Sequence, residues 1–217
     1  MKTKYAFFDV DETILNFKSI FDFYKFWLCQ EYGSIRGNLK YIRLNVYLHV
    51  MSYFRDRYDI NKKFYKEYIH ANESRLKTRG DIWFSKKIKC QSNFNNKILD
   101  RLRQHKIDGF KIVLVSGSIS YCLEPLKNFL EADFLICTQL ESKNSELTGF
   151  LLADPVIGNG KVTRIMDFLK KTNSEYDLLS SFAYGDHVSD IPMLNIVGNP
   201  YLVVNGNPVD FLSTRKK

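Results

Sequence analysis

Three acidic side chains stand close together near the start of the sequence, directly after an apolar segment. The segment YAFF at residues 5–8 is followed by Asp9, Asp11 and Glu12. Crowded carboxylates repel one another and resist burial unless a positive charge neutralises them. A spacing of two residues on an extended segment turns Asp9 and Asp11 in the same direction. The cluster therefore requires a positively charged partner.

Further polar residues follow or precede other apolar segments of the chain. They are Ser116 and Ser118 at the end of FKIVLVSGS, Lys161 at the start of GKVTRIMDFLKKT, and Asp186 and Asp190 after FAYG. In open parallel sheets, ligands bind beyond the carboxyl ends of the strands. If the apolar segments are parallel strands, these polar groups meet the amino-terminal acids at one edge of the sheet.

Strand and helix patterns alternate in the second half of the chain, as such a sheet requires. The predicted strands are residues 4–10, 110–118, 132–140, 179–186 and 200–205, and the predicted helices are residues 95–105, 121–130, 160–172 and 190–197. Alternating elements joined by short loops favour an α/β fold, an open parallel sheet with helices on both faces.

Residues 17–87 differ from this pattern and favour a helical subdomain. Apolar residues recur there at helical spacing, and one series is Leu39, Ile42, Val46, Val50 and Tyr53, with Arg36, Lys40 and Arg43 on the opposite face. We therefore predict a core formed by residues 1–16 and 88–217, with an inserted helical cap at residues 17–87. In the simplest interpretation, the aromatic residues of the cap form its own small core and the roof of the site.

Most of the excess positive charge lies in the cap. The net charge is +8 for the chain, but −1 for residues 1–17, +7 for residues 18–79 and +2 for residues 80–217. A basic segment suggests acidic partners such as phosphorylated small molecules, nucleic acid or anionic lipid. The alternative is a solvated, lysine-rich helical surface. Peripheral contact of the cap with an anionic membrane is a hypothesis that the composition leaves open.

The sequence also bears on the location of the protein. No apolar run approaches the roughly 20 residues that span a bilayer, and the opening MKTKYAFF loses its apolar character at Asp9. The cysteines lack metal-binding spacing, which favours reduced thiols; they are Cys29, Cys90, Cys122 and Cys137. We therefore predict a cytoplasmic protein.

The polar residues together form an ordered signature that extends across nearly the whole chain. It consists of DxDxT at residues 9–13, Ser116, Lys161 and GDxxxD at residues 185–190. This signature resembles that of the haloacid dehalogenase superfamily of phosphohydrolases. The segments SGSISYCLEPLKNFL, TQLESKNSELTG and AYGDHVSDIPML are similar to those of its phosphoserine-phosphatase-like branch, which carries a helical cap after the first motif. The resemblance implies the Rossmann-like α/β core of that superfamily.

The resemblance also implies a catalytic role for each matching residue. Asp9 would be the nucleophile that forms an aspartyl-phosphate, and Asp11 would be the general acid and base. Ser116, the backbone amide of Gly117 and Lys161 would bind the transferred phosphoryl group. The implied activity is hydrolysis of a phosphomonoester, with a small phosphorylated molecule as partner and no nucleic acid.

The cofactor implied by the resemblance is Mg²⁺, which supplies the positive charge that the crowded acids require. Its ligands would be the carboxylates of Asp9 and Asp186 and the backbone carbonyl of Asp11, while Asp190 would orient these ligands or join them. Glu12 stands where many members of the superfamily have glycine, so the local backbone geometry is an open point.

Lys18 is the position that bears most on the substrate. Phosphoserine phosphatases carry a glutamate there, five residues after the threonine of the first motif, and it binds the ammonium group of the substrate. A lysine reverses this charge and repels an ammonium group. We therefore predict that Lys18 contacts a substrate other than phosphoserine, either an acidic phosphomonoester or a lipid-like one.

Other interpretations of the same residues remain open. Asp9 and Asp11 could be turn or helix-capping acids, and Ser116 and Asp186 could be turn residues. Lys161 could lie on the surface, and Asp190 could cap a helix before the proline at residue 192. The same signature would also serve a phosphotransferase that passes the aspartyl-phosphate to an alcohol. A non-catalytic scaffold is disfavoured, because a scaffold has no need of a buried cluster of like charges.

Overall fold

The computed structural model describes residues 2–55, 57–172 and 175–214. Its centre is a six-stranded sheet of order β3-β2-β1-β6-β7-β8, parallel except for β8, which pairs antiparallel with β7. The strands are β1 (Tyr5–Asp9), β2 (Lys111–Ile119), β3 (Phe134–Thr138), β6 (Phe182–Gly185), β7 (Asn199–Val204) and β8 (Asn207–Asp210). The prediction of an open parallel sheet is confirmed. The short antiparallel edge strand β8 was not predicted.

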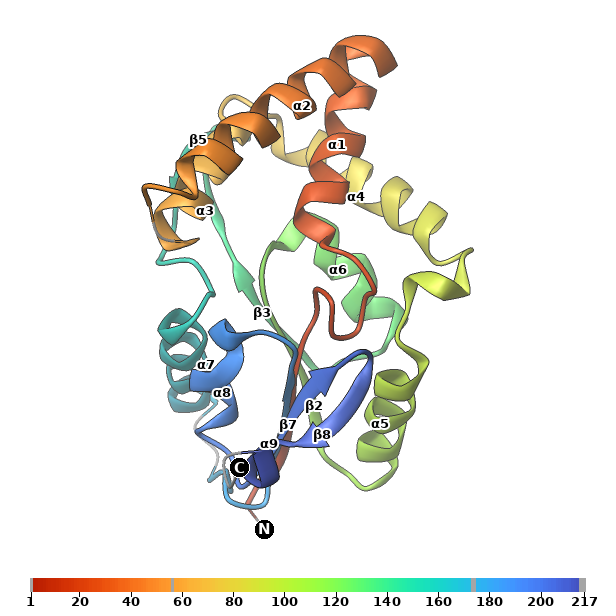
Figure 1. Ribbon diagram of the computed structural model, residues 1–217, viewed down its shortest axis with the longest axis vertical. Helices are drawn as coiled ribbons and strands as arrows, with labels where there is room; N and C mark the ends of the chain where they lie inside the picture. The colour runs from red at the N-terminus through yellow and green to blue at the C-terminus, as the bar shows by residue number, and fades with distance from the viewer. Residues whose placement is uncertain (1, 56, 173–174, 215–217) are drawn as a thin grey trace.

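Helices cover both faces of this sheet (Figure 1). One face carries α5 (Asn96–Ile107) and α6 (Ser120–Phe129), and the other carries α7 (Asn159–Lys171) and α8 (Ile191–Leu194), which follows η3 (Val188–Asp190). Along β1, Ala6 and Phe8 join the first hydrophobic cluster, whereas Tyr5 and Phe7 join the second. Every side chain of β1 is buried, as expected for a central parallel strand. The short helix α9 (Phe211–Thr214) follows β8.

The segment between β1 and α5 is helical and forms the upper part of the molecule in Figure 1. It contains α1 (Ser19–Tyr32), α2 (Ser34–Met51), α3 (Arg57–Tyr65), η1 (Lys66–Tyr68) and α4 (Glu73–Lys87), followed by η2 (Gln91–Asn93). Aromatic side chains of α1, α3, η1 and α4 share one hydrophobic cluster with α5 and α6. At Gly80 of α4, an added Cβ would lie 1.8 Å from the carbonyl oxygen of Tyr121. Only glycine permits this approach of α4 to α6.

The apolar face that helical spacing predicts for α2 is not the buried face. The residues of this face are solvent-exposed, and the buried residues of α2 are Gly37, Leu44 and Leu48. Leu39, Ile42, Val46 and Val50 are between 51% and 62% exposed. Helical periodicity predicted the helix but not its buried face, because α2 has apolar residues on two opposite sides.

A two-stranded hairpin, absent from the sequence-based prediction, extends from the sheet towards the helices. It consists of β4 (Leu140–Lys143) and β5 (Glu146–Leu151). Asn144 and Ser145 both have positive φ, 52° and 64°, as in a type I′ turn. The backbone N–H of His70 donates to the carbonyl of Leu147 at 2.8 Å, which ties the hairpin to the end of η1.

Across the described ranges, each helix is too short or too polar to serve as a transmembrane span.

Candidate active site

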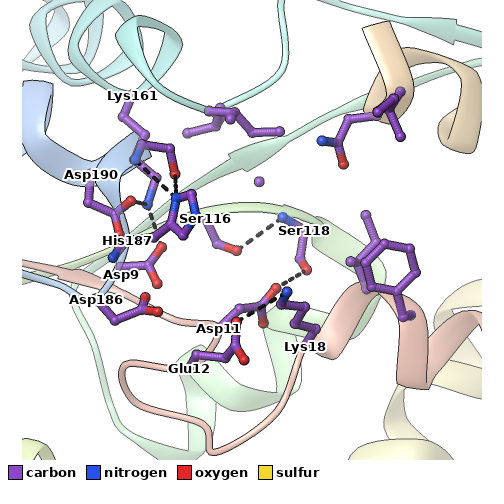
Figure 2. Close-up of a pocket in the computed structure, with 18 residues that line it drawn as sticks. Asp9, Asp11, Glu12, Lys18, Ser116, Ser118, Lys161, Asp186, His187 and Asp190 are labelled. Atoms are coloured by element: carbon purple, nitrogen blue, oxygen red, sulfur yellow. Dashed lines mark hydrogen bonds and ion pairs between the residues drawn. The ribbon is translucent and has the colours of Figure 1, made fainter. Parts of the chain in front are cut away.

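The carboxyl edge of the sheet contains a cavity of about 240 Å³ (Figure 2). Its walls come from the ends of β1, β2 and β6, the first turn of α7, and residues of α1 and α3. All of the predicted site residues line it: Asp9, Asp11, Lys18, Ser116, Gly117, Lys161, Asp186 and Asp190. Residues up to 181 positions apart in the sequence therefore share one pocket, because parallel strands direct their carboxyl ends to one edge.

Lys161 neutralises part of the acidic cluster. Its ammonium group contacts Asp9 Oδ1 and donates to Asp190 Oδ1 at 2.7 Å. All three side chains are buried, with at most 6% of each residue exposed. Burial by itself would lower the pKa of Lys161, but the carboxylates of Asp9 and Asp190 raise it to about 12. A cation in the first turn of a helix opposes the helix dipole, so the two carboxylates compensate an otherwise unfavourable position.

Burial has the opposite effect on the acids. Loss of hydration raises the pKa of Asp9 well above its ordinary value, with the ammonium of Lys161 opposing this rise. Burial also raises the pKa of Asp186, and the neighbouring carboxylate of Asp190 adds to the effect. Additional positive charge beside these two carboxyl groups would favour their ionised forms.

The donor set fits a hard divalent cation. Carboxylate oxygens of Asp9, Asp186 and Asp190 lie within 4.8 Å of one another, and Lys161 contributes one positive charge to these three acids. The Thr13 hydroxyl donates to Asp186 Oδ1 at 3.1 Å, and the His187 backbone N–H donates to Asp190 Oδ2 at 3.0 Å. Oxygen ligands and excess negative charge are the features that Mg²⁺ prefers.

Gly185 is required for this arrangement. An added Cβ at Gly185 would lie 2.5 Å from Cβ of Asp190. The glycine of the GDxxxD motif thus lets the chain turn so that Asp186 and Asp190 approach the same point.

Asp11 lies in another part of the cavity from the Lys161 cluster (Figure 2). Its Oδ1 accepts the backbone N–H of Ser19 at 2.9 Å, and its Oδ2 accepts the hydroxyl of Ser118 at 3.0 Å. The hydroxyls of Ser19 and Ser118 lie 2.7 Å apart. Burial raises the pKa of Asp11, while these hydrogen bonds lower it. The carboxylate of Asp11 is therefore hydrogen-bonded to the start of α1. The three carboxylates that lie close enough together to hold a metal ion are those of residues 9, 186 and 190.

Ser116 and Gly117 lie near the carboxyl end of the adjacent strand, β2. Ser116 is buried, and its Oγ accepts the backbone N–H of Ser118 at 3.0 Å. The Gly117 carbonyl accepts the hydroxyl of Thr138 at 3.0 Å and that of Tyr65 from α3. This end of β2 is thus fixed from both the sheet and the helical segment.

Lys18 lines the cavity but is paired with another side chain. Its ammonium lies 3.3 Å from Glu12 Oε2, and both side chains are about half exposed, 48% and 49%. Glu12 has a φ of 63°, in the left-handed region that favours glycine. Glu12, which stands where many members of the superfamily have glycine, therefore adopts a backbone conformation that glycine favours.

Several lining residues were given no role from the sequence. They are Ser118, which was noted only for its position at the strand end, and the helical residues Ile20, Phe21, Ile60 and Asn61. The position of Ser118, two residues after Ser116, was an available signal, because alternate residues of a strand share a face. No comparable signal marked the residues from α1 and α3, since the packing of the helices on the sheet brings them to the cavity.

Comparison with known proteins agrees with this geometry. Residues 6–195 match the haloacid dehalogenase-like hydrolase family. The chain is 25% identical over 138 residues to a phosphoserine phosphatase from Haemophilus influenzae, an alignment that covers 55% of this chain and 43% of that protein. The chain thus spans less than half the length of this curated relative.

Solved structures resemble the chain over most of its length. A protein of unknown function from Bordetella pertussis Tohama I has a TM-score of 0.80 and 20% identity, covering 93% of this chain and 90% of that one. A phospho-aspartyl intermediate analogue of phosphoserine phosphatase has a TM-score of 0.60 and 18% identity, covering 93% and 87%. These two structures establish the α/β fold. Because the family match begins within β1 and extends through α8, taking in every strand end that lines the cavity, the chain belongs to the haloacid dehalogenase-like hydrolase family.

Proposed function

We propose that this chain is a Mg²⁺-dependent phosphomonoester hydrolase that acts through an aspartyl-phosphate on Asp9. The observation that carries the proposal is the shared cavity, in which a buried carboxylate, a buried ammonium and a strand-end serine face one another. A buried cluster of charges costs stability, so a catalytic role gives a reason for these residues to be there. The resemblance to proteins named phosphoserine phosphatase supports the same reaction class.

In the first step, a carboxylate oxygen of Asp9 attacks the phosphorus atom. A bond forms between this oxygen and phosphorus, and the bond from phosphorus to the leaving oxygen breaks. Asp11 gives its proton to the leaving oxygen. Ser116, the Gly117 amide and Lys161 bind the phosphoryl oxygens, and the positive charge of Lys161 offsets the charge of the transition state.

In the second step, water releases the phosphoryl group. Asp11, now ionised, takes a proton from the attacking water, and the new oxygen–phosphorus bond displaces the carboxylate of Asp9. The products are inorganic phosphate and the regenerated Asp9 carboxylate. Two such displacements divide one difficult hydrolysis into two easier reactions.

Mg²⁺ would be held by Asp9, Asp186 and the backbone carbonyl of Asp11, with Asp190 as a further ligand or an orienting group. When bound, it supplies positive charge that screens Asp9 from the phosphate it attacks. Residues 1–16 and 88–217 would act as the catalytic core, and residues 17–87 as a cap that excludes bulk water. A cytoplasmic location is part of the same proposal.

The substrate that we propose is an acidic or lipid-like phosphomonoester. The charge at Lys18 disfavours the ammonium group of phosphoserine, although the curated relative from Haemophilus influenzae is named a phosphoserine phosphatase. Because Lys18 already pairs with Glu12, a substrate acid would compete with that carboxylate for the ammonium group.

The test is a panel of phosphomonoesters assayed with Mg²⁺ and with EDTA. The panel contains phosphoserine, glycerol phosphates, sugar phosphates and lysophosphatidate, with Asp9→Asn as the blank and the exposed Asp100→Asn as the matched control. We expect Asp9→Asn and EDTA to lower phosphate release about 10³-fold or more, and Asp100→Asn to leave it unchanged. Equal release by Asp9→Asn would refute the mechanism, and a clear preference for phosphoserine would refute the substrate class.

A further inference from the structure

The outer face of α2 is a continuous apolar surface that no other described part of the chain covers. It consists of Ile35, Leu39, Ile42, Val46 and Val50, continued by Tyr53 and Phe54, with exposed fractions from 51% to 80%. The spacings of three and four residues place the five helical members on one side of α2. Isolated exposed apolar residues are ordinary, but a contiguous patch of this kind marks an interaction site.

This surface lies opposite the face by which α2 packs on the rest of the protein. The buried residues of α2 are Gly37, Leu44 and Leu48, which lie on the other side of the helix at 100° per residue. Figure 1 shows α2 at the end of the molecule opposite to the chain termini. The patch is therefore presented outward and is not required for folding of the helix.

Charge indicates which partner the patch fits. The helix contains Arg36, Lys40 and Arg43 but no aspartate or glutamate. These three cations lie along one flank of the apolar surface and not on its opposite face, as the sequence had suggested, because the opposite face is the buried one. None forms an ion pair with a carboxylate of the described residues. An apolar face flanked by cations is typical of a helix that lies in the interface of an anionic membrane.

A cavity of about 360 Å³ adjoins this cationic flank. It lies between α1, α2 and η1 and is lined by Lys40, Arg43, Tyr32, Tyr47 and Glu67, among others. The ammonium of Lys40 lies 3.6 Å from the centroid of the Tyr32 ring. Tyrosine is enriched where membranes meet water, and Tyr32 and Tyr47 are both exposed, so the flank offers charges and rings suited to the headgroup region.

A second copy of the chain fits the patch less well. Pairing two α2 helices would bring two surfaces of the same positive sign together, with no acid on either helix to balance them. We propose that α2 docks the protein on an anionic lipid surface, with the aliphatic residues in the outer acyl region and Arg36, Lys40 and Arg43 at lipid phosphates.

The experiment measures binding of the full chain to vesicles without any substrate, so its result does not depend on the proposed function. Vesicles of phosphatidylcholine, with or without phosphatidylglycerol, are sedimented at low and high salt. We expect binding only with phosphatidylglycerol and weakening by salt. Leu39→Ser/Val46→Ser should lower vesicle affinity about 100-fold, and Lys40→Gln/Arg43→Gln about 30-fold.

The control is Arg101→Gln/Arg103→Gln, which removes the same charge from exposed positions of α5. It should bind as the unmodified chain does, and circular dichroism should show that all variants are folded. No vesicle binding, or equal binding to pure phosphatidylcholine, would overturn the proposal. A dimer in sedimentation velocity that Leu39→Ser/Val46→Ser dissociates, without vesicle binding, would assign the face to a second copy instead.

Discussion

Soluble proteins usually bury apolar side chains and expose charged ones. The cavity at the edge of the sheet buries charged side chains, and the outer face of α2 exposes apolar ones. At the cavity, charged side chains such as Asp9, Lys161 and Asp190 are almost fully buried. On α2, aliphatic side chains such as Leu39 and Val46 are largely exposed. Buried charges and exposed apolar patches are each costly. The contrast teaches that the buried charges are partly neutralised within the chain by Lys161, whereas the apolar face of α2 has no described part of the chain against it.

The largest effect is expected when the cation of the buried cluster is removed. Lys161→Met removes the ammonium and leaves Asp9 and Asp190 buried without their shared partner. We expect phosphate release to fall about 10²–10³-fold and the free energy of unfolding without Mg²⁺ to fall by about 3–5 kcal/mol. Steady-state kinetics and urea denaturation measure the two quantities. Lys171→Met, an exposed lysine of α7, is the control, and equal losses in both variants would contradict the role of Lys161.

The buried and the exposed face of α2 each carry a leucine, so the same substitution can be compared on both faces. Leu48 is 7% exposed and Leu39 is 62% exposed. Leu48→Ala should lower the free energy of unfolding by about 2–4 kcal/mol, because it leaves a cavity. Leu39→Ala should change it by no more than about 0.5 kcal/mol. Urea denaturation of the monomer without lipid checks this, and a large loss for Leu39→Ala would mean that the exposed face packs within the protein.

His105 extends the comparison to a buried polar group whose side-chain hydrogen bond is to an uncharged hydroxyl. Its Nε2 lies 2.8 Å from the hydroxyl of Tyr184, and its ring contacts Phe8 and Phe182. Burial lowers the pKa of His105 to about 4, below the ordinary value of about 6.5. As the pH falls, His105 is therefore protonated in the unfolded chain before it is protonated in the folded chain. The stability that is fully present above pH 6.5 is lost as the pH falls towards 4.

The loss due to His105 should be on the order of 2–3 kcal/mol over this range. Chemical denaturation at several pH values measures it. His105→Gln, which retains a hydrogen-bonding group for Tyr184, should flatten the curve between pH 6.5 and 4. An unchanged curve in His105→Gln would show that other groups cause the acid sensitivity.

The smallest effect concerns the backbone beside the cavity. Glu12→Gly relieves a left-handed conformation at φ 63° and removes a half-exposed ion pair with Lys18, which contributes little. We expect a rise of about 0.5–1 kcal/mol in the free energy of unfolding. Thermal denaturation measures the change. A decrease would indicate that the pair with Lys18 matters more than the backbone strain.

Much of the fold followed from the sequence because its signals are local. The buried strands β1, β2 and β6 were predicted from continuous apolar runs, and the residues at their ends were expected to meet at one edge. The hairpin of β4 and β5 was missed, although Asn144 and Ser145 carried a turn signal. Apart from Lys18, the cap residues that line the cavity had no local signal in the sequence.

The sequence by itself determined which residue types stand at the strand ends, since strand periodicity and parallel pairing leave those positions little freedom. Only the tertiary structure decided their partners. Lys161 reaches Asp9 across 152 positions of sequence, and Asp11 is held by Ser19 and Ser118. It also decided which side of α2 is buried, because a helix with two apolar sides has no local property that distinguishes them, and the choice depends on packing against α1.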